Sequence, residues 1–384
     1  MRFLFLMKDK KVSHLFLSSL RHESRLEKEI MVSIDLGYSN IEAIGISDEV
    51  GYKGHNYTAI LFRSLYSRLG KPRIPVVKEV LVISAFLGYL ITAIRYCLNS
   101  RTVVIHNWEI LVTTPFFKLI GKKVFYHPHE LESQKAGKNK NYNHAALTIE
   151  RTLIRLVDNV IVVSPPIAEY YRRVVFKRDY GVVRNIPTES LMSFSEGISI
   201  KDIFGIKGEE FLAIYVGNIS GLRGINDLLD IFSNNNKKHI AFVGYGELRN
   251  KVIEYANTYK NIHYHKPVDR SELVRLISDA DVGISWIAED WGLSYRFSLS
   301  NKFSDYIFAG LPILSSDNLE YVSELIRKNE LGFQIGSNIN DLYKFVLNIE
   351  LEDCKKLKVN IESFKENWNW DTDRMVLEEA YNKI

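Results

Sequence analysis

Residues 213–229 read AIYVGNISGLRGINDLL, and this stretch decides the fold. It begins as an apolar run typical of a buried strand and turns at Gly217 and Asn218. After Arg223 and Gly224 its apolar residues recur at helical spacing. A strand that leads directly into a helix is the repeating unit of α/β proteins with parallel sheets. The stretch therefore predicts such a unit.

The same plan extends outward along the whole chain. Short runs rich in Val, Ile, Phe and Tyr alternate with longer helical patterns, so we predict an α/β fold with parallel sheets. The predicted strands lie near 13–19, 41–47, 102–106, 122–127 and 159–163, and then near 211–216, 239–243, 261–264, 281–285 and 312–315. The predicted helices of the second half lie near 224–233, 246–258, 270–278 and 301–309.

A length of 384 residues favours two domains. Residues 186–208 lack sustained periodicity and collect Ser, Gly and Pro, which is typical of an inter-domain linker. We predict an N-terminal domain over 1–190, a linker over 191–208, a C-terminal domain over 209–363 and a terminal segment over 364–384.

The cysteine content excludes a small domain held together by disulfides and a zinc-finger domain. Cys97 and Cys354 are the only cysteines and belong to no CxxC or Cys/His cluster, so a disulfide framework or a zinc-finger site lacks its ligands. The opening MRFLFLMKDKK has too short an apolar run for a secretory signal. We expect a cytoplasmic protein.

Charge is distributed unevenly between the halves. Residues 1–190 have a net charge of +11, whereas residues 191–384 have −7. The first half is thus expected to face something anionic, such as nucleic acid, a phosphorylated ligand or an acidic membrane surface. Because no nucleic-acid-binding motif accompanies the basic residues, including the cluster at 172–178, we expect no nucleic-acid partner.

One apolar stretch bears on membranes. Residues 80–94, VLVISAFLGYLITAI, form too short a run to cross a bilayer, which takes about 20 apolar residues. A basic stretch precedes it, which suits a helix lying on an anionic membrane, although a buried helix flanked by solvated lysines fits equally well. The basic residues are Lys53, Arg63, Arg68, Lys71, Arg73 and Lys78.

Two helix starts in the second half carry positive side chains. Arg223 stands just before one predicted helix, and Lys302 lies in the first turn of another. A cation there opposes the helix dipole unless an anion is bound, and helix N-termini at the carboxyl ends of strands are common phosphate sites. Asp305, one turn after Lys302, could accept hydrogen bonds from ribose hydroxyls.

Residues 213–229, 261–285 and 299–317 together resemble, in order and spacing, the nucleotide-binding domain of the retaining family-4 glycosyltransferases of GT-B fold. The similarity covers about 150 residues of the second half, the length of a typical domain. The first half is similar more thinly, at RHESRLEKEI (21–30), VFYHPHELES (124–133) and DNVIVVSPPIAEYY (158–171), as is FKENWNWDTDRMVLEEAYNKI (364–384). The resemblance implies two Rossmann-like domains facing across a cleft.

The resemblance also implies roles for individual residues. Arg223 takes the place of the family's phosphate-clamping lysine and Asn218 that of its phosphate-binding arginine, while Asp305 falls where a glutamate contacts ribose. His129 matches a histidine that approaches the transferred sugar. The implied catalytic residues are His129, Arg223 and Lys302; the donor-binding residues are Gly217, Asn218, Val268, Asn301 and Asp305; and the acceptor-side residues are Arg21, His22 and Glu130.

The sequence departs from the family at two places. Phe297 stands where the family has the first of two glutamates, and Glu289 or Asp290 could replace it. The glycine-rich loop after the first strand is missing, with residues 20–23, LRHE, in its place. These departures leave open a catalytically silent binding or scaffold protein. A GT-B nucleotide-sugar epimerase is a second alternative, because it would share the nucleotide site.

The sequence thus predicts a glycosyltransferase of hexosyltransferase type. We expect a UDP- or GDP-sugar donor and a saccharide or lipid-linked saccharide acceptor, with retention implied by the resemblance. The expected setting is bacterial envelope polysaccharide synthesis, peripheral on the inner face of the plasma membrane. No cofactor or metal is expected, because Asp279 and Asp281 suit helix capping and His127 with His129 lacks a third ligand nearby.

Overall fold

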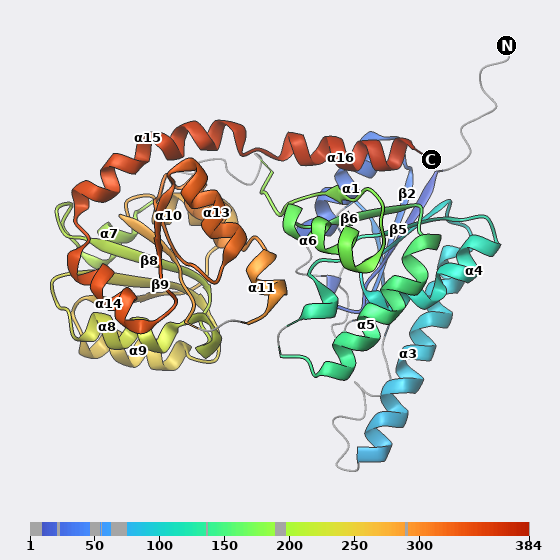
Figure 1. Ribbon diagram of the computed structural model, residues 1–384, viewed down its shortest axis with the longest axis horizontal. Helices are drawn as coiled ribbons and strands as arrows, with labels where there is room; N and C mark the ends of the chain where they lie inside the picture. The colour runs from blue at the N-terminus through green and yellow to red at the C-terminus, as the bar shows by residue number, and fades with distance from the viewer. Residues whose placement is uncertain are drawn as a thin grey trace. The chain divides into compact units, whose positions relative to one another are not determined.

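The computed structural model describes residues 10–20, 24–46, 54, 56–62, 75–135, 137–188, 197–288 and 291–383. The chain divides into two compact units. The first comprises Met1–Arg184 and Asp371–Ile384, and the second comprises Asn185–Trp370. Each unit consists of a sheet with helices on both of its faces (Figure 1).

The first unit contains a parallel sheet in the order β3-β2-β1-β4-β5-β6-β7. Its strands are β1 (Lys11–Leu15), β2 (Asn40–Ile46), β3 (Thr58–Phe62), β4 (Thr102–Ile105), β5 (Lys123–Tyr126), β6 (Asn159–Val162) and β7 (Gly181–Val182). Its helices are α1 (Ser24–Asp35), α3 (Pro75–Cys97), α4 (Thr114–Leu119), α5 (Lys140–Leu153), α6 (Pro165–Tyr170) and, from the end of the chain, α16 (Trp370–Asn382).

The second unit contains a parallel sheet in the order β10-β9-β8-β11-β12-β13. Its strands are β8 (Leu212–Asn218), β9 (His239–Tyr245), β10 (Ile262–His265), β11 (Val282–Ser285), β12 (Ile313–Ser316) and β13 (Gly332–Ile335). Its helices are α7 (Ile200–Phe204), α8 (Ile225–Ser233), α9 (Arg249–Thr258), α10 (Arg270–Ile277), α11 (Leu293–Phe297), α12 (Asn301–Phe308), α13 (Glu320–Asn329), α14 (Ile339–Asn348) and α15 (Leu351–Asn367).

Each sheet reverses its strand order once. The chain builds outward from β1 through β2 to β3 and then crosses to β4, and it does the same from β8 through β10 to β11. Such a switch point leaves a crevice outside the carboxyl ends of the two central strands, where ligands of open α/β sheets bind. The segments after β1 and β4, and after β8 and β11, are therefore the places to look for a site.

The predicted strands and helices agree with the structure apart from small shifts at their ends. Three strands were not predicted, namely β3, β7 and β13, of which β3 and β13 are only half-buried and β7 has two residues. The predicted linker contains helix α7, which Ser199 begins with a reciprocal capping box and Ile200 anchors in the core.

One further expectation from the sequence needs correction. The apolar stretch near 80–94, expected to be too short to cross a bilayer, belongs to a helix of 23 residues whose segment Lys78–Cys97 is long and apolar enough to do so, because helical structure extends into its less apolar flanks.

Trp368 packs inside the second unit. Its ring lies against Phe303 and Phe364, and its Nε1 donates to Ser304 Oγ at 3.1 Å. Trp368 thus supports helix α12.

Candidate functional site

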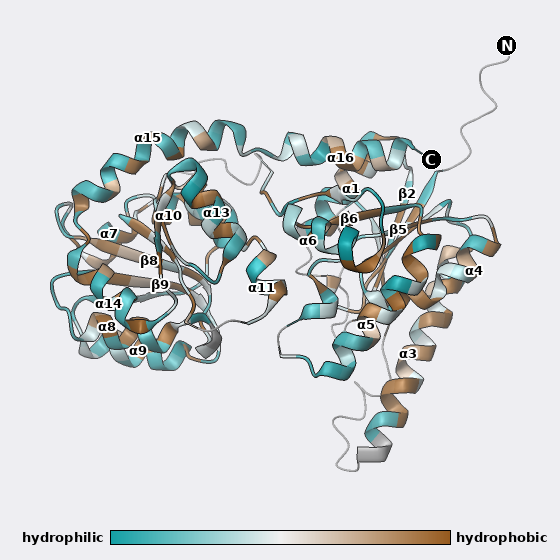
Figure 2. Cartoon of the chain, in the orientation of Figure 1, coloured by the Kyte–Doolittle hydropathy of each residue, from teal (hydrophilic) through white to brown (hydrophobic). Residues whose placement is uncertain are grey.

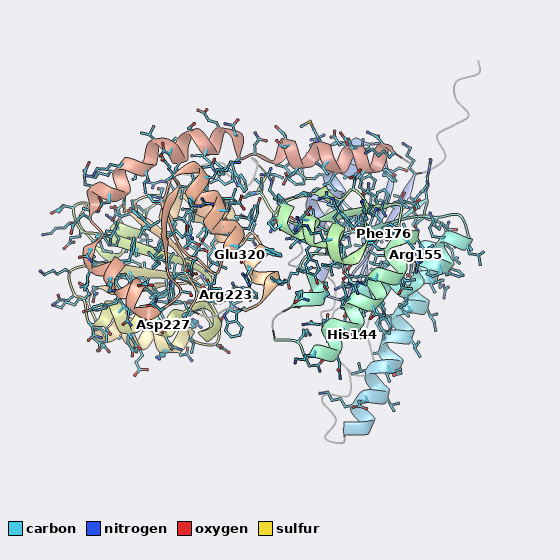
Figure 3. The ribbon with its side chains drawn as sticks, in the orientation of Figure 1. His144, Arg155, Phe176, Arg223, Asp227 and Glu320 are labelled. Carbon is cyan, nitrogen blue, oxygen red and sulfur yellow. The ribbon has the colours of Figure 1, made fainter. Side chains whose placement is uncertain are left out.

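Arg223 is held in a tight turn at the carboxyl end of β8. Gly224, which ends this turn, has a φ of 70°, a left-handed conformation that favours glycine. A Cβ there would lie 3.0 Å from the ring of the buried Trp286. The backbone can therefore pass close to Trp286 and begin α8 at once, which leaves Arg223 at the helix start beside α11 (Figure 3).

Helix α12 is fixed against the centre of the sheet by Tyr306. The hydroxyl of this buried side chain lies 3.0 Å from the carbonyl oxygen of Ile284 in β11, and it accepts from the amide of Val216 in β8 at 3.1 Å. The ring requires Gly283, where a Cβ would lie only 2.4 Å from it. Because Lys302 stands one turn before Tyr306, these contacts set its position at the switch point.

Lys302 and Arg223 converge on the end of β8. The Lys302 ammonium lies 3.8 Å from the ring centre of Tyr215, and the Arg223 guanidinium lies 4.8 Å from that of Tyr295. Burial, together with the nearby charge of Arg223, holds the pKa of Lys302 well below its usual value, and Asp305 only partly opposes this. Two mutually repelling cations thus share one place in the fold.

Neither cation is neutralised by an ion pair within the part of the chain that the structure describes. Lys302 is half-buried. Gly217, with a φ of 115°, lies beside the Lys302 side chain and has no side chain of its own to cover the backbone there. An unpaired half-buried lysine next to an arginine is electrostatically unfavourable until an anion binds. The arrangement therefore suits a diphosphate.

The other predicted donor-side residues all belong to the second unit. Asn218 is exposed at the end of β8. Asn301, exposed at the start of α12, accepts a hydrogen bond from the side chain of Asn185. Val268 is half-buried in the segment between β10 and α10. Their predicted contacts with phosphate and base remain predictions.

Asp305 is engaged in an ion pair that the sequence did not indicate. It is only 5% exposed, and its Oδ1 accepts from Arg270 Nε at 3.1 Å and Nη2 at 2.9 Å. Burial raises the pKa of Asp305 above its usual value, and Arg270 opposes that shift. Asp305 thus links α12 to α10, and its contact with a ribose remains a prediction.

Several predicted positions lie outside the described residues, namely Arg21, His22, Glu289 and Asp290. Phe297 is half-buried at the end of α11. On the acceptor side, Glu130 is exposed and pairs with Lys135 at 3.1 Å.

The first unit contains a histidine network that the sequence analysis missed. At the switch point of its sheet, His14 Nδ1 lies 3.1 Å from His106 Nε2, and His106 Nδ1 lies 3.0 Å from His129 Nε2. Nearby, His127 Nδ1 lies 3.0 Å from a carboxylate oxygen of Glu29. The only local signal was a histidine directly after each of two buried strands, β4 and β5.

Hydrogen bonding along this network has one favoured direction. A neutral imidazole has a single N–H, so donation must run the same way through His14, His106 and His129. Burial lowers the pKa of His14 to about 4 and that of His106 well below its usual value, so both are neutral at physiological pH. His14 Nε2 has no partner among the described residues, which favours the N–H on Nδ1, since a buried N–H is rarely left without an acceptor. His129 then accepts at Nε2.

Among the described residues, one group has the composition of a metal site. Atoms of His14, Glu29 and His106 lie within 4.8 Å of one another and are all buried. Within this group, His14 Nδ1 lies 3.1 Å from His106 Nε2 and 3.6 Å from a carboxylate oxygen of Glu29. Asp279 and Asp281 instead hold α7, with Asp281 3.0 Å from Lys201 Nζ and Asp279 accepting from the Lys201 amide at 3.0 Å.

The basic cluster after β6 is largely engaged within the first unit. Arg172 and Arg173 both pair with Glu169. Arg178 donates to the carbonyl oxygens of Val157 and Asp158 at 2.8 and 2.9 Å. Structural contacts therefore account for three of its four cations.

Comparison with known proteins covers both the sequence and the fold. Residues 215–370, less than half of the chain, match the family described as Glucosyltransferase 3-like, C-terminal domain. No curated protein matches the sequence. Among solved structures, the fold is similar over nearly its whole length to several glycosyltransferases.

Three of these structures illustrate the likeness. Sucrose-phosphate synthase from Thermosynechococcus elongatus is 16% identical with a TM-score of 0.70, covering 97% of this chain and 98% of that one. Anabaena Alr3699/HepE in complex with UDP and glucose is 12% identical with a TM-score of 0.72, covering 98% and 100%. WaaG, a glycosyltransferase involved in lipopolysaccharide biosynthesis, is 14% identical with a TM-score of 0.64, covering 96% and 98%.

The chain has the GT-B fold. Its two Rossmann-like units confirm the predicted fold class. The matched residues 215–370 include both Arg223 and Lys302.

The lowered pKa of Lys302 has a measurable consequence for binding. A bound diphosphate would raise that pKa, so between the free and bound pKa values the protein should take up a proton as UDP binds, and affinity should fall as pH rises. Calorimetry in buffers of different ionisation enthalpy measures this uptake, at a pH where UDP is fully ionised. Binding without any proton exchange across the alkaline range would contradict the expectation.

Proposed function

We propose that this chain is a glycosyltransferase that moves a sugar from a nucleoside diphosphate donor to a hydroxyl group. The observation that carries the proposal is the convergence of Arg223 and Lys302, without ion-pair partners among described residues, at the switch point of the second sheet. The matched glucosyltransferase-like family and the UDP bound to a protein of similar fold support it.

The chemistry follows from where charge develops. As the bond between the sugar's anomeric carbon and the diphosphate oxygen breaks, negative charge grows on the leaving diphosphate. Positive groups already in place stabilise that charge more in the transition state than in the ground state, which lowers the barrier. The negative diphosphate also favours the protonated form of Lys302. Lys302 is therefore expected to be fully charged when negative charge is present on the leaving group.

The acceptor step completes the proposal. The acceptor oxygen forms a bond to the anomeric carbon, and its proton passes to an oxygen of the departing diphosphate. This transfer on one face gives retention, as the resemblance to family-4 enzymes implies. We propose a UDP- or GDP-hexose as donor and a saccharide or lipid-linked saccharide of a bacterial envelope polysaccharide as acceptor. His129, oriented by His106, is proposed to contact the transferred sugar.

A thermal-shift panel of UDP-, GDP-, ADP- and CMP-sugars tests the proposal. At least one nucleotide sugar should stabilise the protein, and Lys302→Met should abolish that stabilisation. Lys356→Met is the matched control, because Lys356 is 66% exposed on α15 and should leave the shift unchanged.

Two outcomes would point to the rival functions. If no nucleotide sugar stabilises the wild-type chain, a catalytically silent scaffold is favoured. If a nucleotide sugar is converted to an isomer without any acceptor, an epimerase is favoured.

A further inference from the structure

Helix α3 exposes a stripe of large apolar side chains. Val80, Ile83, Leu87 and Ile91 are 60%, 60%, 53% and 69% exposed. At about 100° per residue these four positions fall on one side of the helix. Much of α3 is coloured brown, the hydrophobic end of the scale, in the cartoon (Figure 2). Exposed apolar stripes of this length are unusual in a protein surrounded only by water.

The opposite side of α3 belongs to the core of the first unit. Tyr89, Ala93 and Cys97 are fully buried, and the Tyr89 hydroxyl donates to the carbonyl oxygen of Ile44 in β2 at 3.2 Å. Gly88 brings the helix close to Phe62 of β3, where a Cβ would lie 3.0 Å from the ring. The second half of α3 is therefore packed against the sheet.

This packing decides how α3 could meet a membrane. Its segment Lys78–Cys97 is long and apolar enough to cross a bilayer. The most apolar window of this segment has a mean hydropathy of 1.8, and only 17% of that window is buried. Crossing would pull Tyr89 and Cys97 out of the core and leave the carbonyl oxygen of Ile44 without its partner. A helix with one side in the protein core and one apolar side exposed can instead lie in the interface.

Helix α4 of the same unit also exposes apolar side chains. Helix α3 contacts the turn Trp108–Thr113, which leads into α4. There Phe116 and Leu119 are 38% and 86% exposed, and Ile120 follows with 39%. The two helices thus present apolar side chains on the same unit.

The charges around this face have the sign that anionic lipids attract. Residues 75–123 contain six lysines and arginines but only two acidic residues. On α3 itself, Lys78 and Arg95 stand near the two ends, opposed only by Glu79. Asp158 neutralises part of the charge near α4 by pairing with Lys118 at 2.7 Å. Basic residues flanking an apolar helix face are typical of proteins that bind acidic membranes.

We propose that the exposed face of α3 and α4 docks on the surface of an anionic lipid bilayer. The apolar stripe would enter the boundary between headgroups and acyl chains, while Lys78 and Arg95 remain at the headgroups. The proposal does not depend on glycosyltransferase activity, because it rests on the first unit alone. If both proposals hold, the protein would act where a lipid-linked acceptor lies.

Vesicle flotation of the full chain tests this docking. The wild-type protein should float with vesicles of phosphatidylcholine and phosphatidylglycerol. The double variant Ile83→Glu with Ile91→Glu should lose at least about tenfold of its vesicle-bound fraction, since it places two carboxylates in the apolar stripe. Val359→Glu is the matched control, because Val359 is 76% exposed on α15 of the second unit and should float like wild type.

Further arms separate the explanations. Unchanged melting temperatures should show that the variants fold, since the replaced side chains are exposed. Lys78→Gln with Arg95→Gln should weaken flotation on anionic vesicles, and wild type should bind less to phosphatidylcholine alone. Equal flotation of the double glutamate variant, or no flotation of wild type, would overturn the proposal. A wild-type dimer that the glutamates dissociate, without vesicle binding, would overturn it in favour of an interface between copies.

Discussion

Replacing Lys302 by Met should lower the turnover of the donor sugar by on the order of 10²–10³-fold. This is the loss expected when one preorganised protein group that stabilises charge on the leaving group is removed. Met keeps the length and apolar stem of the side chain, so its packing against Tyr215 is retained while the charge is lost. Release of nucleoside diphosphate from the best-binding donor measures the effect. The loss should appear in both KM and kcat, because Lys302 is expected to bind the diphosphate of the donor and to stabilise the charge that grows on it as the bond breaks.

Arg223→Met should have a similar effect, and the double variant should lose less than the product of the two single losses. Both cations are expected to act on one diphosphate, and residues that act on the same charge are not additive. Lys356→Met again serves as the control. Independent, fully multiplicative losses would contradict a shared anion, and normal turnover in both single variants would remove the assigned site.

Replacing Arg270 by Met should destabilise the protein by roughly 2–3 kcal/mol, below the usual range for a fully buried ion pair because Arg270 keeps some exposure to solvent. The change leaves the Asp305 carboxylate buried without its partner. Burial already raises the pKa of Asp305, so without Arg270 the group should protonate more readily. The loss of stability should therefore grow as pH rises. At higher pH the folded variant must either hold an unpaired buried carboxylate ionised or keep a proton that the unfolded chain would release, and both cost free energy.

A double variant, Arg270→Met with Asp305→Leu, provides the control for this prediction. It removes both charges, so it should recover a large part of the stability that the single variant loses. Denaturant unfolding at two pH values measures all three proteins. A double variant less stable than Arg270→Met would show that packing of Asp305, rather than its unpaired charge, accounts for the loss.

The helices and strands were predictable because their signals are local. Alternating apolar runs and helical spacing reflect only which side of a segment is buried, and that pattern is present within ten to twenty residues for each element, about the usual element length. The candidate roles of Arg223 and Lys302 were also predictable from the sequence, because a cation at a predicted helix start conflicts with the helix dipole whatever the rest of the fold is.

Contacts between distant segments were not predictable in this way. His14 and His106 are 92 positions apart, and Arg270 and Asp305 are 35 apart. Nothing in the segment around each residue indicates which distant residue it meets. Only the strand order, which places β1 beside β4, brings the two histidines within hydrogen-bonding distance.

The sequence by itself determined that this protein is a pair of parallel α/β units with cations at two helix starts, since periodicity and residue type are written locally. The tertiary structure decided what those residues meet. It placed Lys302 beside Tyr215 and Arg223, paired Asp305 with Arg270 in an ion pair, and left one side of α3 exposed. The physical reason is that burial and charge interaction depend on which elements pack together, and packing is a property of the folded chain as a whole.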